Sequence, residues 1–179
     1  MRCFIAIELP QEIKARIFHE VEILKDSGLI KGNFVQKEGL HLTIKFLGDT
    51  TEEQVKKIKE SLKKIKFKPF DITIKDFGFF PSEDHIKVLW LGVYSDKIKD
   101  FFKVVHEATP EFKISHEDFS PHLTLARVKS VKNKESLLDK IKHLKKINNA
   151  FVVKDFVLMK SELTREGTKY KVLEKFELS

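Results

Sequence analysis

The sequence contains few of the residues that cross-link, interrupt or anchor a fold. Its 179 residues include one cysteine, two methionines, five prolines and seven glycines. A single cysteine excludes an internal disulfide and fits a reducing cytoplasm, and Cys3 is expected to be a small buried side chain. No apolar run is long enough to span a membrane, and the chain start leads straight into Glu8, which predicts a strand instead of a signal peptide. We therefore expect a cytoplasmic protein without a membrane segment.

Several motifs that bind metals or nucleotides are also missing. The chain has no Cys-x-x-Cys and no His-Glu-x-x-His, so a zinc site is not expected. It has no Gly-x-x-x-x-Gly-Lys loop for the phosphates of ATP and no Gly-x-Ser-x-Gly nucleophile. These absences predict a protein that uses no metal and no cofactor.

Charged residues are numerous and unbalanced. Lys and Arg total 34 and Asp and Glu 27, which gives a formal net charge of +7. The excess favours a polyanionic partner. Abundant Lys and Glu with little Cys and Met is also typical of proteins from hot environments, so both explanations stay open. Hydrophobic residues make up 41% of the chain, enough for the core of one large domain or of two small lobes.

One tripeptide occurs twice in the chain, as His41-Leu42-Thr43 and as His122-Leu123-Thr124. Polar and apolar residues alternate in each copy, which predicts a half-buried strand. In each copy the histidine and the threonine then share one face, and Lys45 is expected on that same face in the first copy. A single pair would indicate a histidine on a solvated strand. Two matched pairs indicate one site built from two equivalent strands.

Hydrophobic periodicity predicts strands that alternate with helices. Helices are expected after Pro10, after a capping box at residues 51–54, after a cap at Ser95 and after a cap at Asn133. The glycines between residues 28 and 39 predict a loop, and residues 78–84 predict a turn-rich break. Strands are expected at residues 2–8, 41–47, 70–80, 86–93, 151–159 and 170–178. A further strand, that of the second motif, is expected to begin at residue 122.

The predicted order of elements repeats along the chain. Strand, helix, motif strand, helix and strand occur in residues 2–78 and again in residues 86–159, with a C-terminal strand at 168–178. We predict a single bilobal α+β domain, residues 1–179, whose halves are related by a pseudo-two-fold axis. Two mainly antiparallel sheets would flank a cleft with the helices outside, and the axis would bring both motif histidines to that cleft.

Two histidines in one cleft suit concerted acid and base catalysis near neutral pH. One ring takes a proton from a nucleophile while the other gives a proton to a leaving group, and the threonine hydroxyls can bind anionic oxygens. In-line displacement at a phosphodiester has these requirements. The five other histidines are expected at the surface, with His116 and Lys45 within reach of the cleft rim.

The residues around both motifs form a series of blocks, which are 2–7, 39–48, 78–81, 88–93, 119–127 and Leu158-x-x-Ser161 with Tyr170. These blocks resemble the 2H phosphoesterases, and among them the RNA 2',3'-cyclic phosphodiesterases, also called 2'-5' RNA ligases. The resemblance extends over nearly the whole chain. It implies the bilobal fold with a cleft and a metal-free, ATP-independent site.

The resemblance also implies an activity and a role for each motif residue. The activity is the opening of a terminal 2',3'-cyclic phosphate of RNA, including tRNA fragments, to a 2'-phosphate by a monomeric enzyme. His41 corresponds to the proton donor and His122 to the proton acceptor, while Thr43 and Thr124 bind the phosphate. Arg127 closes the second motif as a further phosphate contact, although strand alternation places it opposite His122 unless the strand ends or bulges there.

Two other functions stay open at this point. The chain is expected either to act on small cyclic nucleotides or to be a non-catalytic RNA-binding module, and some relatives join RNA ends through 2'-5' linkages. Two intact His-Thr pairs argue against a non-catalytic module. The sequence does not separate RNA from small nucleotides, because the width of the cleft decides the length of the substrate.

Overall fold

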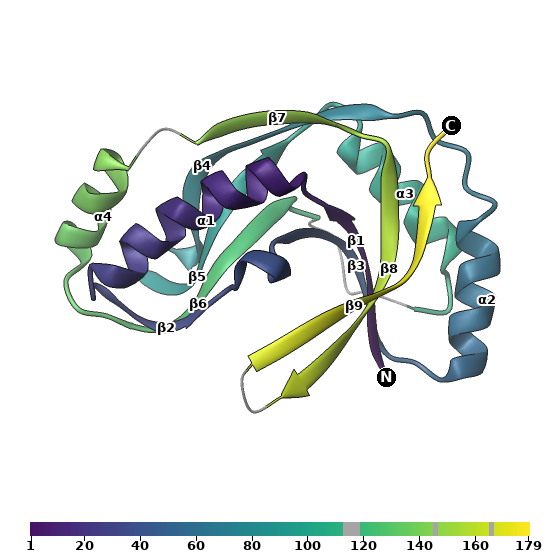
Figure 1. Cartoon of the computed structure of the whole chain (residues 1–179), viewed down its shortest axis with the longest axis horizontal. Helices are drawn as coiled ribbons and strands as arrows, with labels where there is room; N and C mark the ends of the chain where they lie inside the picture. Colours follow the sequence, from purple (N-terminus) through teal and green to yellow (C-terminus); the bar gives the residue numbers. More distant parts are fainter. Residues whose placement is uncertain (113–118, 145–146, 165–166) are drawn as a thin grey trace.

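Two antiparallel sheets and four α-helices make up the described part of the chain, which is residues 1–112, 119–144, 147–164 and 167–179 of a computed structural model (Figure 1). Sheet A has the strand order β3-β1-β8-β9, and sheet B has the order β2-β6-β5-β4-β7. This arrangement confirms the α+β prediction with antiparallel sheets. The strands are β1 (Arg2–Glu8), β2 (Ile30–Phe34), β3 (His41–Asp49), β4 (Phe70–Ser82), β5 (His85–Tyr94), β6 (His122–Val131), β7 (Asn148–Val153), β8 (Asp155–Thr164) and β9 (Gly167–Glu177).

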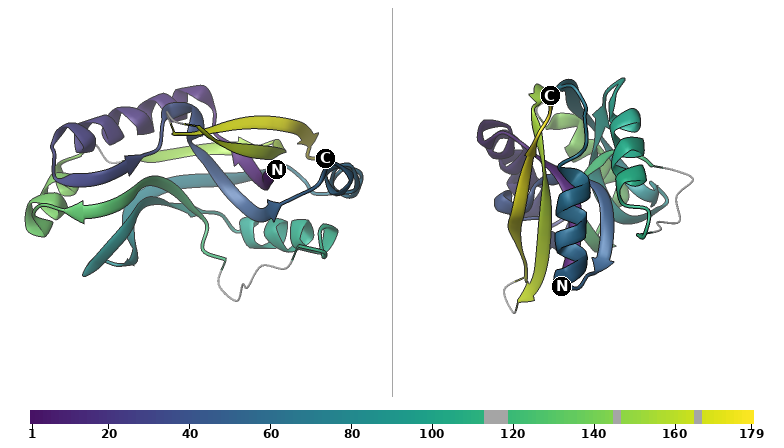
Figure 2. Two further views of the ribbon diagram at one scale, coloured as in Figure 1. Left: turned by 90° about the horizontal axis from the view of Figure 1, so that it is seen from below. Right: turned by 90° about the vertical axis from the view of Figure 1, so that its right-hand side faces the viewer.

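The helices lie in two pairs at opposite ends of the molecule. Helices α1 and α4 lie at one end, and α2 and α3 lie at the other (Figures 1 and 2). The apolar stripe of α1, formed by Ile13, Ile17, Val21 and Leu24, is buried throughout. A 3₁₀ turn, η1 (Lys37–Gly39), comes just before the first motif strand. The helices are α1 (Gln11–Asp26), α2 (Glu52–Leu62), α3 (Ile98–Ala108) and α4 (Lys134–His143).

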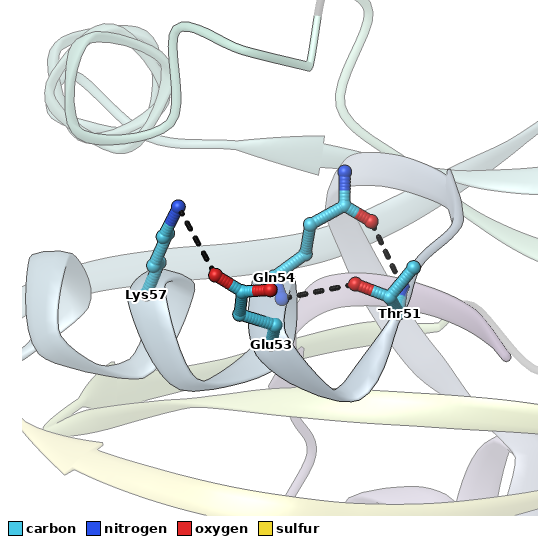
Figure 3. A network of polar contacts seen from close by, with 4 residues as sticks. All are labelled: Thr51, Glu53, Gln54 and Lys57. Atoms are coloured by element: carbon cyan, nitrogen blue, oxygen red, sulfur yellow. Dashed lines mark hydrogen bonds and ion pairs between the residues drawn. The ribbon is translucent and has the colours of Figure 1, made fainter.

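The predicted capping box fixes the start of α2. The Thr51 hydroxyl accepts a hydrogen bond from the Gln54 backbone N–H at 3.2 Å, and the Gln54 side chain accepts one from the Thr51 N–H at 2.8 Å (Figure 3). Two backbone donors that the helix leaves unpaired are thereby satisfied. The cap predicted at Asn133 is also present, because its side chain accepts from the Ser136 N–H at 2.8 Å.

The two halves of the chain exchange strands. Strand β4 belongs to the first half but lies between β5 and β7 of sheet B, whereas β8 belongs to the second half but lies between β1 and β9 of sheet A. The two halves meet at β4 and β7, which are paired strands, and in this pair Ile72 lies opposite Phe151. These two residues are 79 positions apart, and the same offset separates two copies of one tripeptide, Lys75-Asp76-Phe77 and Lys154-Asp155-Phe156. The pseudo-two-fold relationship inferred from the sequence therefore has a counterpart in the strand pairing.

Some predicted elements are wrong in extent. The predicted loop before the first motif contains β2, because Gly32 lies so close to β6 that a Cβ would be 2.2 Å from the Arg127 carbonyl oxygen. Glycine there permits strand pairing. The predicted break at 78–84 is mostly strand, since β4 continues to Ser82. The single strand predicted for 151–159 is two strands, β7 and β8, which belong to different sheets.

Strand β1 is buried on both faces. Cys3, Ile5 and Ile7 belong to the main core, whereas Phe4 and Ala6 pack with Val157 and Met159 in a separate small cluster. The face with Phe4 and Ala6 is also the face of the first motif, as the register with β3 shows. The small cluster therefore forms the floor beneath the first His-Thr pair.

Candidate active site

The two motif strands have the same local geometry. The burial pattern along β3 from His41 repeats residue by residue along β6 from His122. In each strand the histidine and threonine are half-buried and the residues between and after them are buried. The shared pattern confirms that each histidine lies on the same face as its threonine, and β3 and β6 are in contact.

A β-bulge interrupts the alternation at the same point in both strands. In β3, Lys45 pairs with Ile5 while Thr43 pairs with Ala6, so Ile44 is the extra residue. In β6, the pairings of Leu89 and Trp90 leave Leu125 as the extra residue. Two successive residues are therefore buried, and the next one returns to the motif face.

The bulge corrects the prediction made for Lys45. Its side chain does not share the face of His41 and does not reach a cleft rim, because Lys45 is 1% exposed. The ammonium donates hydrogen bonds to the Thr109 carbonyl at 2.8 Å and to the Thr109 hydroxyl at 2.9 Å, and lies 3.1 Å from His106 Nδ1. Burial lowers the pKa of Lys45 from 10.5 to about 8. Lys45 is thus a buried link between β3 and the end of α3, where a cation complements the helix dipole.

The equivalent bulge in β6 determines on which face of the strand Arg127 lies. Arg127 pairs with Val88, and Thr124 pairs with Trp90, which lies two residues from Val88 on the same face. Arg127 therefore shares the face of His122 and Thr124, and its side chain is exposed. Its charge acts on the Tyr170 hydroxyl, where it opposes the rise in pKa that burial causes. An arginine of β6 thus lies near a tyrosine of β9.

The His41 ring contacts two aromatic rings and lies near the buried ammonium group of Lys14. Its ring centroid is 4.8 Å from that of Phe4 and 4.9 Å from that of Tyr170. Burial lowers the pKa of His41 from 6.5 to about 4, helped by the positive charge of Lys14 and opposed by the Gly39 backbone. Within the described residues its Nδ1 makes no hydrogen bond of normal geometry. The ring is therefore neutral at pH 7 in the ligand-free protein.

His122 has an equivalent pair of rings and a fixed orientation. Its ring centroid lies 4.9 Å from Phe80 and 6.2 Å from Trp90. The Trp90 indole covers Gly78 so closely that a Cβ there would lie 2.1 Å from it. His122 Nδ1 donates to the Ser120 carbonyl at 2.7 Å. Because a carbonyl only accepts, the neutral ring keeps its lone pair on Nε2, where a base can use it.

The other histidines are divided between the surface and the interior. His19, His85 and His143 are exposed, as predicted. His106 is half-buried against Lys45, so its prediction as a surface residue is wrong. His116 lies outside the described residues.

Two cavities lie among the described residues, and one of them includes Glu8, the strand partner of His41, in its lining. One cavity lies between α1 and α4 and another beside the start of α1 and the β7–β8 junction, and neither is lined by a motif histidine. No group of His, Cys, Asp or Glu suited to a metal ion occurs among the described residues. Within the same residues, no helix is long and apolar enough to cross a membrane. Lys14 approaches His41 without any local sequence signal, because only the fold brings it there. Tyr170 belongs to the blocks that carry the resemblance, but nothing in its local sequence places it beside His41.

The sequence is similar to a protein family and to characterised proteins over nearly its whole length. The model of the LigT-like phosphoesterase family matches residues 7–90 and 93–170. A protein of Methanocaldococcus jannaschii named RNA 2',3'-cyclic phosphodiesterase is 36% identical over 98% of this chain and 100% of its own length. A protein of the same name from Thermotoga maritima is 34% identical over 97% of this chain and 93% of its own.

Solved structures have the same fold. TT0787 of Thermus thermophilus superposes with a TM-score of 0.80 at 26% identity, covering 99% of this chain and 98% of that one. E. coli LigT complexed with 3'-AMP gives a TM-score of 0.79 at 26% identity with the same coverage. With a family match over most of its length and relatives above 30% identity, this chain belongs to the LigT-like phosphoesterase family.

Proposed function

We propose that this protein hydrolyses the terminal 2',3'-cyclic phosphate of RNA to a 2'-phosphomonoester, with His41 and His122 as the acid and base. The observation that supports it most directly is the equivalence of β3 and β6, which gives two His-Thr pairs in one bulged geometry. Full-length relatives named RNA 2',3'-cyclic phosphodiesterase support the substrate.

The reaction needs one ring to accept a proton and the other to donate one. His122 Nε2 takes a proton from water, since its Nδ1 is held by the Ser120 carbonyl. The water oxygen bonds to phosphorus as the bond to the 3' oxygen breaks, and His41 gives its proton to that oxygen. The product then has a 2'-phosphate and a free 3' hydroxyl. Thr43 and Thr124 donate hydrogen bonds to the non-bridging oxygens, and Arg127 supplies positive charge to the same group.

The low pKa of His41 fits a donor that is protonated only with the substrate bound. In the free protein burial and Lys14 keep the ring neutral. A phosphate beside the ring favours the charged form and raises its pKa. The proton that reaches the 3' oxygen is therefore taken up together with the substrate.

A second candidate is the hydrolysis of small 2',3'-cyclic nucleotides. The structure of E. coli LigT with 3'-AMP favours it, because a mononucleotide occupies that relative. Joining of RNA ends through 2'-5' linkages would be the reverse reaction, with a ribose hydroxyl in place of water. For the cell we propose a monomeric cytoplasmic enzyme acting on RNA fragments, including those of tRNA.

The test is hydrolysis of a short RNA with a 2',3'-cyclic phosphate end and of 2',3'-cyclic AMP, each in EDTA and without ATP. We expect a 2'-phosphate product from the RNA and, in His41→Ala and His122→Ala, a rate lower by about 10²–10⁴-fold. His19→Ala, which removes an exposed histidine of α1, is the control. Wild-type protein that opens neither substrate would refute the activity, and full activity of either motif variant would refute the two-histidine mechanism.

A further inference from the structure

Lys75, in the first copy of the Lys-Asp-Phe tripeptide, lies in line with His122 across sheet B. Lys75 pairs with Gly92 of β5, and Gly92 pairs with His122 of β6. Residues that lie opposite each other in an antiparallel sheet share a face, so these three form one row across three adjacent strands. Lys75 is therefore on the face of His122, and two strand spacings place their Cα atoms about 10 Å apart.

An aromatic ring holds the Lys75 side chain on this face. Gly92 has no side chain, and the Tyr94 ring lies over it, because a Cβ at Gly92 would lie 2.9 Å from that ring. The Lys75 ammonium is 4.8 Å from the centroid of the Tyr94 ring, which attracts the cation. The Tyr94 hydroxyl donates a hydrogen bond to the Asp76 carboxylate at 3.0 Å. Lys75 thus has a defined position beside the strand partner of His122.

The Lys75 ammonium is accessible to an anion. Lys75 is half-buried and the ring beneath its ammonium, that of Tyr94, is 47% exposed. Within the described part of the chain Lys75 forms no ion pair. Arg127 lies further along β6, whereas Lys75 lies across the sheet from His122. The face of His122 therefore has cations in two directions.

The second copy of the tripeptide lacks this arrangement. Lys154 is exposed and lines the cavity that includes Glu8, the strand partner of His41. Glu8 places a partly exposed carboxylate where the other half has Gly92, and the ion-pair partner of Glu8, Lys14, is buried. A carboxylate at the surface repels a phosphate. An additional phosphate is therefore favoured beside the second motif and disfavoured beside the first.

The end of an RNA chain and a cyclic mononucleotide differ in one phosphate next to the reacting group. In RNA the terminal nucleotide has a second phosphate on its 5' oxygen, one ribose away from the cyclic phosphate, whereas 2',3'-cyclic AMP has none. In the proposed mechanism Thr43, Thr124 and Arg127 bind the cyclic phosphate. Lys75, displaced from His122 by two strands, is a cation for a neighbouring group and not for the reacting one.

We propose, on the basis of the proposed function, that Lys75 binds the phosphate on the 5' side of the terminal nucleotide. The RNA chain then leaves the site across β5 and β4, past His122. This contact makes the protein prefer the end of an RNA chain to a cyclic mononucleotide. It is also independent of sequence, because a lysine that contacts a phosphate reads no base.

The test compares substrates with and without this phosphate. 2',3'-Cyclic AMP and its 5'-phosphorylated form differ in that group alone. Lys75→Met should raise KM for the 5'-phosphorylated substrate by about 3- to 10-fold with little change in kcat, as expected for one charge contact near the surface. KM for 2',3'-cyclic AMP should change less than twofold. Lys75→Arg, which keeps the charge, should retain KM for the phosphorylated substrate within about twofold of wild type.

The other copy of the tripeptide supplies the matched control. Lys154→Met removes an exposed lysine of the same sequence context and should change KM for neither substrate. A second measurement uses an RNA oligomer with a 2',3'-cyclic phosphate end. The slope of log(kcat/KM) against log salt should decrease by about 0.7 in Lys75→Met, as for one lost phosphate contact to a single strand, and should stay unchanged in Lys154→Met.

Equal losses on both substrates, or an unchanged KM for the 5'-phosphorylated one, would overturn the role of Lys75. A binding comparison separates this outcome from failure of the proposed function. Equilibrium dialysis with 2'-AMP and with adenosine 2',5'-bisphosphate needs no turnover. If wild-type protein opens no cyclic phosphate, the activity is refuted, yet weaker binding of the bisphosphate alone by Lys75→Met still supports the second phosphate contact. Equal binding of the bisphosphate by both proteins refutes it.

Discussion

Tyr170, close to the C-terminal end of the chain, rests edge-on against His41 with 4.9 Å between ring centroids. The same ring lies edge-on to Phe4 at 5.7 Å, and its hydroxyl is within the electrostatic influence of Arg127. Gly39 leaves room for it, because a Cβ there would lie 3.1 Å from the Tyr170 ring. Tyr170 therefore connects the first motif histidine to the arginine of the second motif strand.

Removing the Tyr170 ring should make His41 more basic. Tyr170→Ala opens His41 to water, and since burial is the largest cause of its low pKa, that pKa should rise from about 4 toward 6.5. Tyr170→Phe keeps the ring and should leave the pKa of His41 low. NMR titration of the histidine ring protons measures both variants. A His41 pKa that stays near 4 in Tyr170→Ala would show that the tyrosine does not shield the ring.

The division of labour between the histidines can be tested with the leaving group. A substrate that releases nitrophenolate needs no protonation of its leaving group, so His41→Ala should regain most of its activity on it. His122→Ala should stay impaired, because water still has to lose a proton. The measurement is kcat/KM of each variant on both kinds of ester. Rescue of His122→Ala in place of His41→Ala would reverse the two roles.

Binding of a phosphate ligand should be coupled to proton uptake by His41. At pH 6 the free ring is neutral because its pKa is about 4, and a bound anion raises that pKa. Calorimetric titration with 2'-AMP in buffers of different ionisation enthalpy should show net uptake of up to one proton relative to His41→Gln. The variant accounts for protons exchanged by the ligand itself. Identical proton exchange in the two proteins would argue against a His41 that is protonated on binding.

The buried Lys45 predicts a rise in stability at high pH. Its pKa is about 8 in the folded protein and near 10.5 in the unfolded chain, so between these values the unfolded chain binds more protons. The free energy of unfolding should therefore increase with pH across that window, by about 1–3 kcal/mol. Lys45→Met should lack this increase in urea titrations from pH 7.5 to 10.5, whereas Lys57→Met, at an exposed position, should keep it. A parallel pH dependence in wild type and Lys45→Met would contradict the assignment.

Sequence patterns correctly predicted the features that depend only on residues close together in the sequence. The alternation in the two motifs gave the faces of His41, Thr43, His122 and Thr124, and the caps at Thr51 and Asn133 marked the starts of two helices. Ser95 has the residue type of a cap, but α3 begins later, after Lys97, and has no side-chain cap.

The remaining features depend on contacts between distant strands. The bulges at Ile44 and Leu125 are defined by pairing with β1 and β5, so simple alternation placed Lys45 and Arg127 on the wrong faces. Strand β2 exists because Gly32 fits against β6, and its own residues give only a weak strand pattern. The rings around His41 come from β1 and β9, at opposite ends of the sequence.

The exchange of β4 and β8 determines when the protein can fold as it leaves the ribosome. Strand β1 needs β8 beside it, and Arg2 finds its partner Ser161 only when nearly all of the chain has been synthesised. Until then one edge of the first strand is unpaired, while β4 waits for β5 and β7. Neither half can complete its sheet alone, so nascent chains should stay open until late in synthesis, and folding should be slowed by these long-range pairings. Each sheet contains a strand from the other half, so we expect the two halves to unfold together as one cooperative unit.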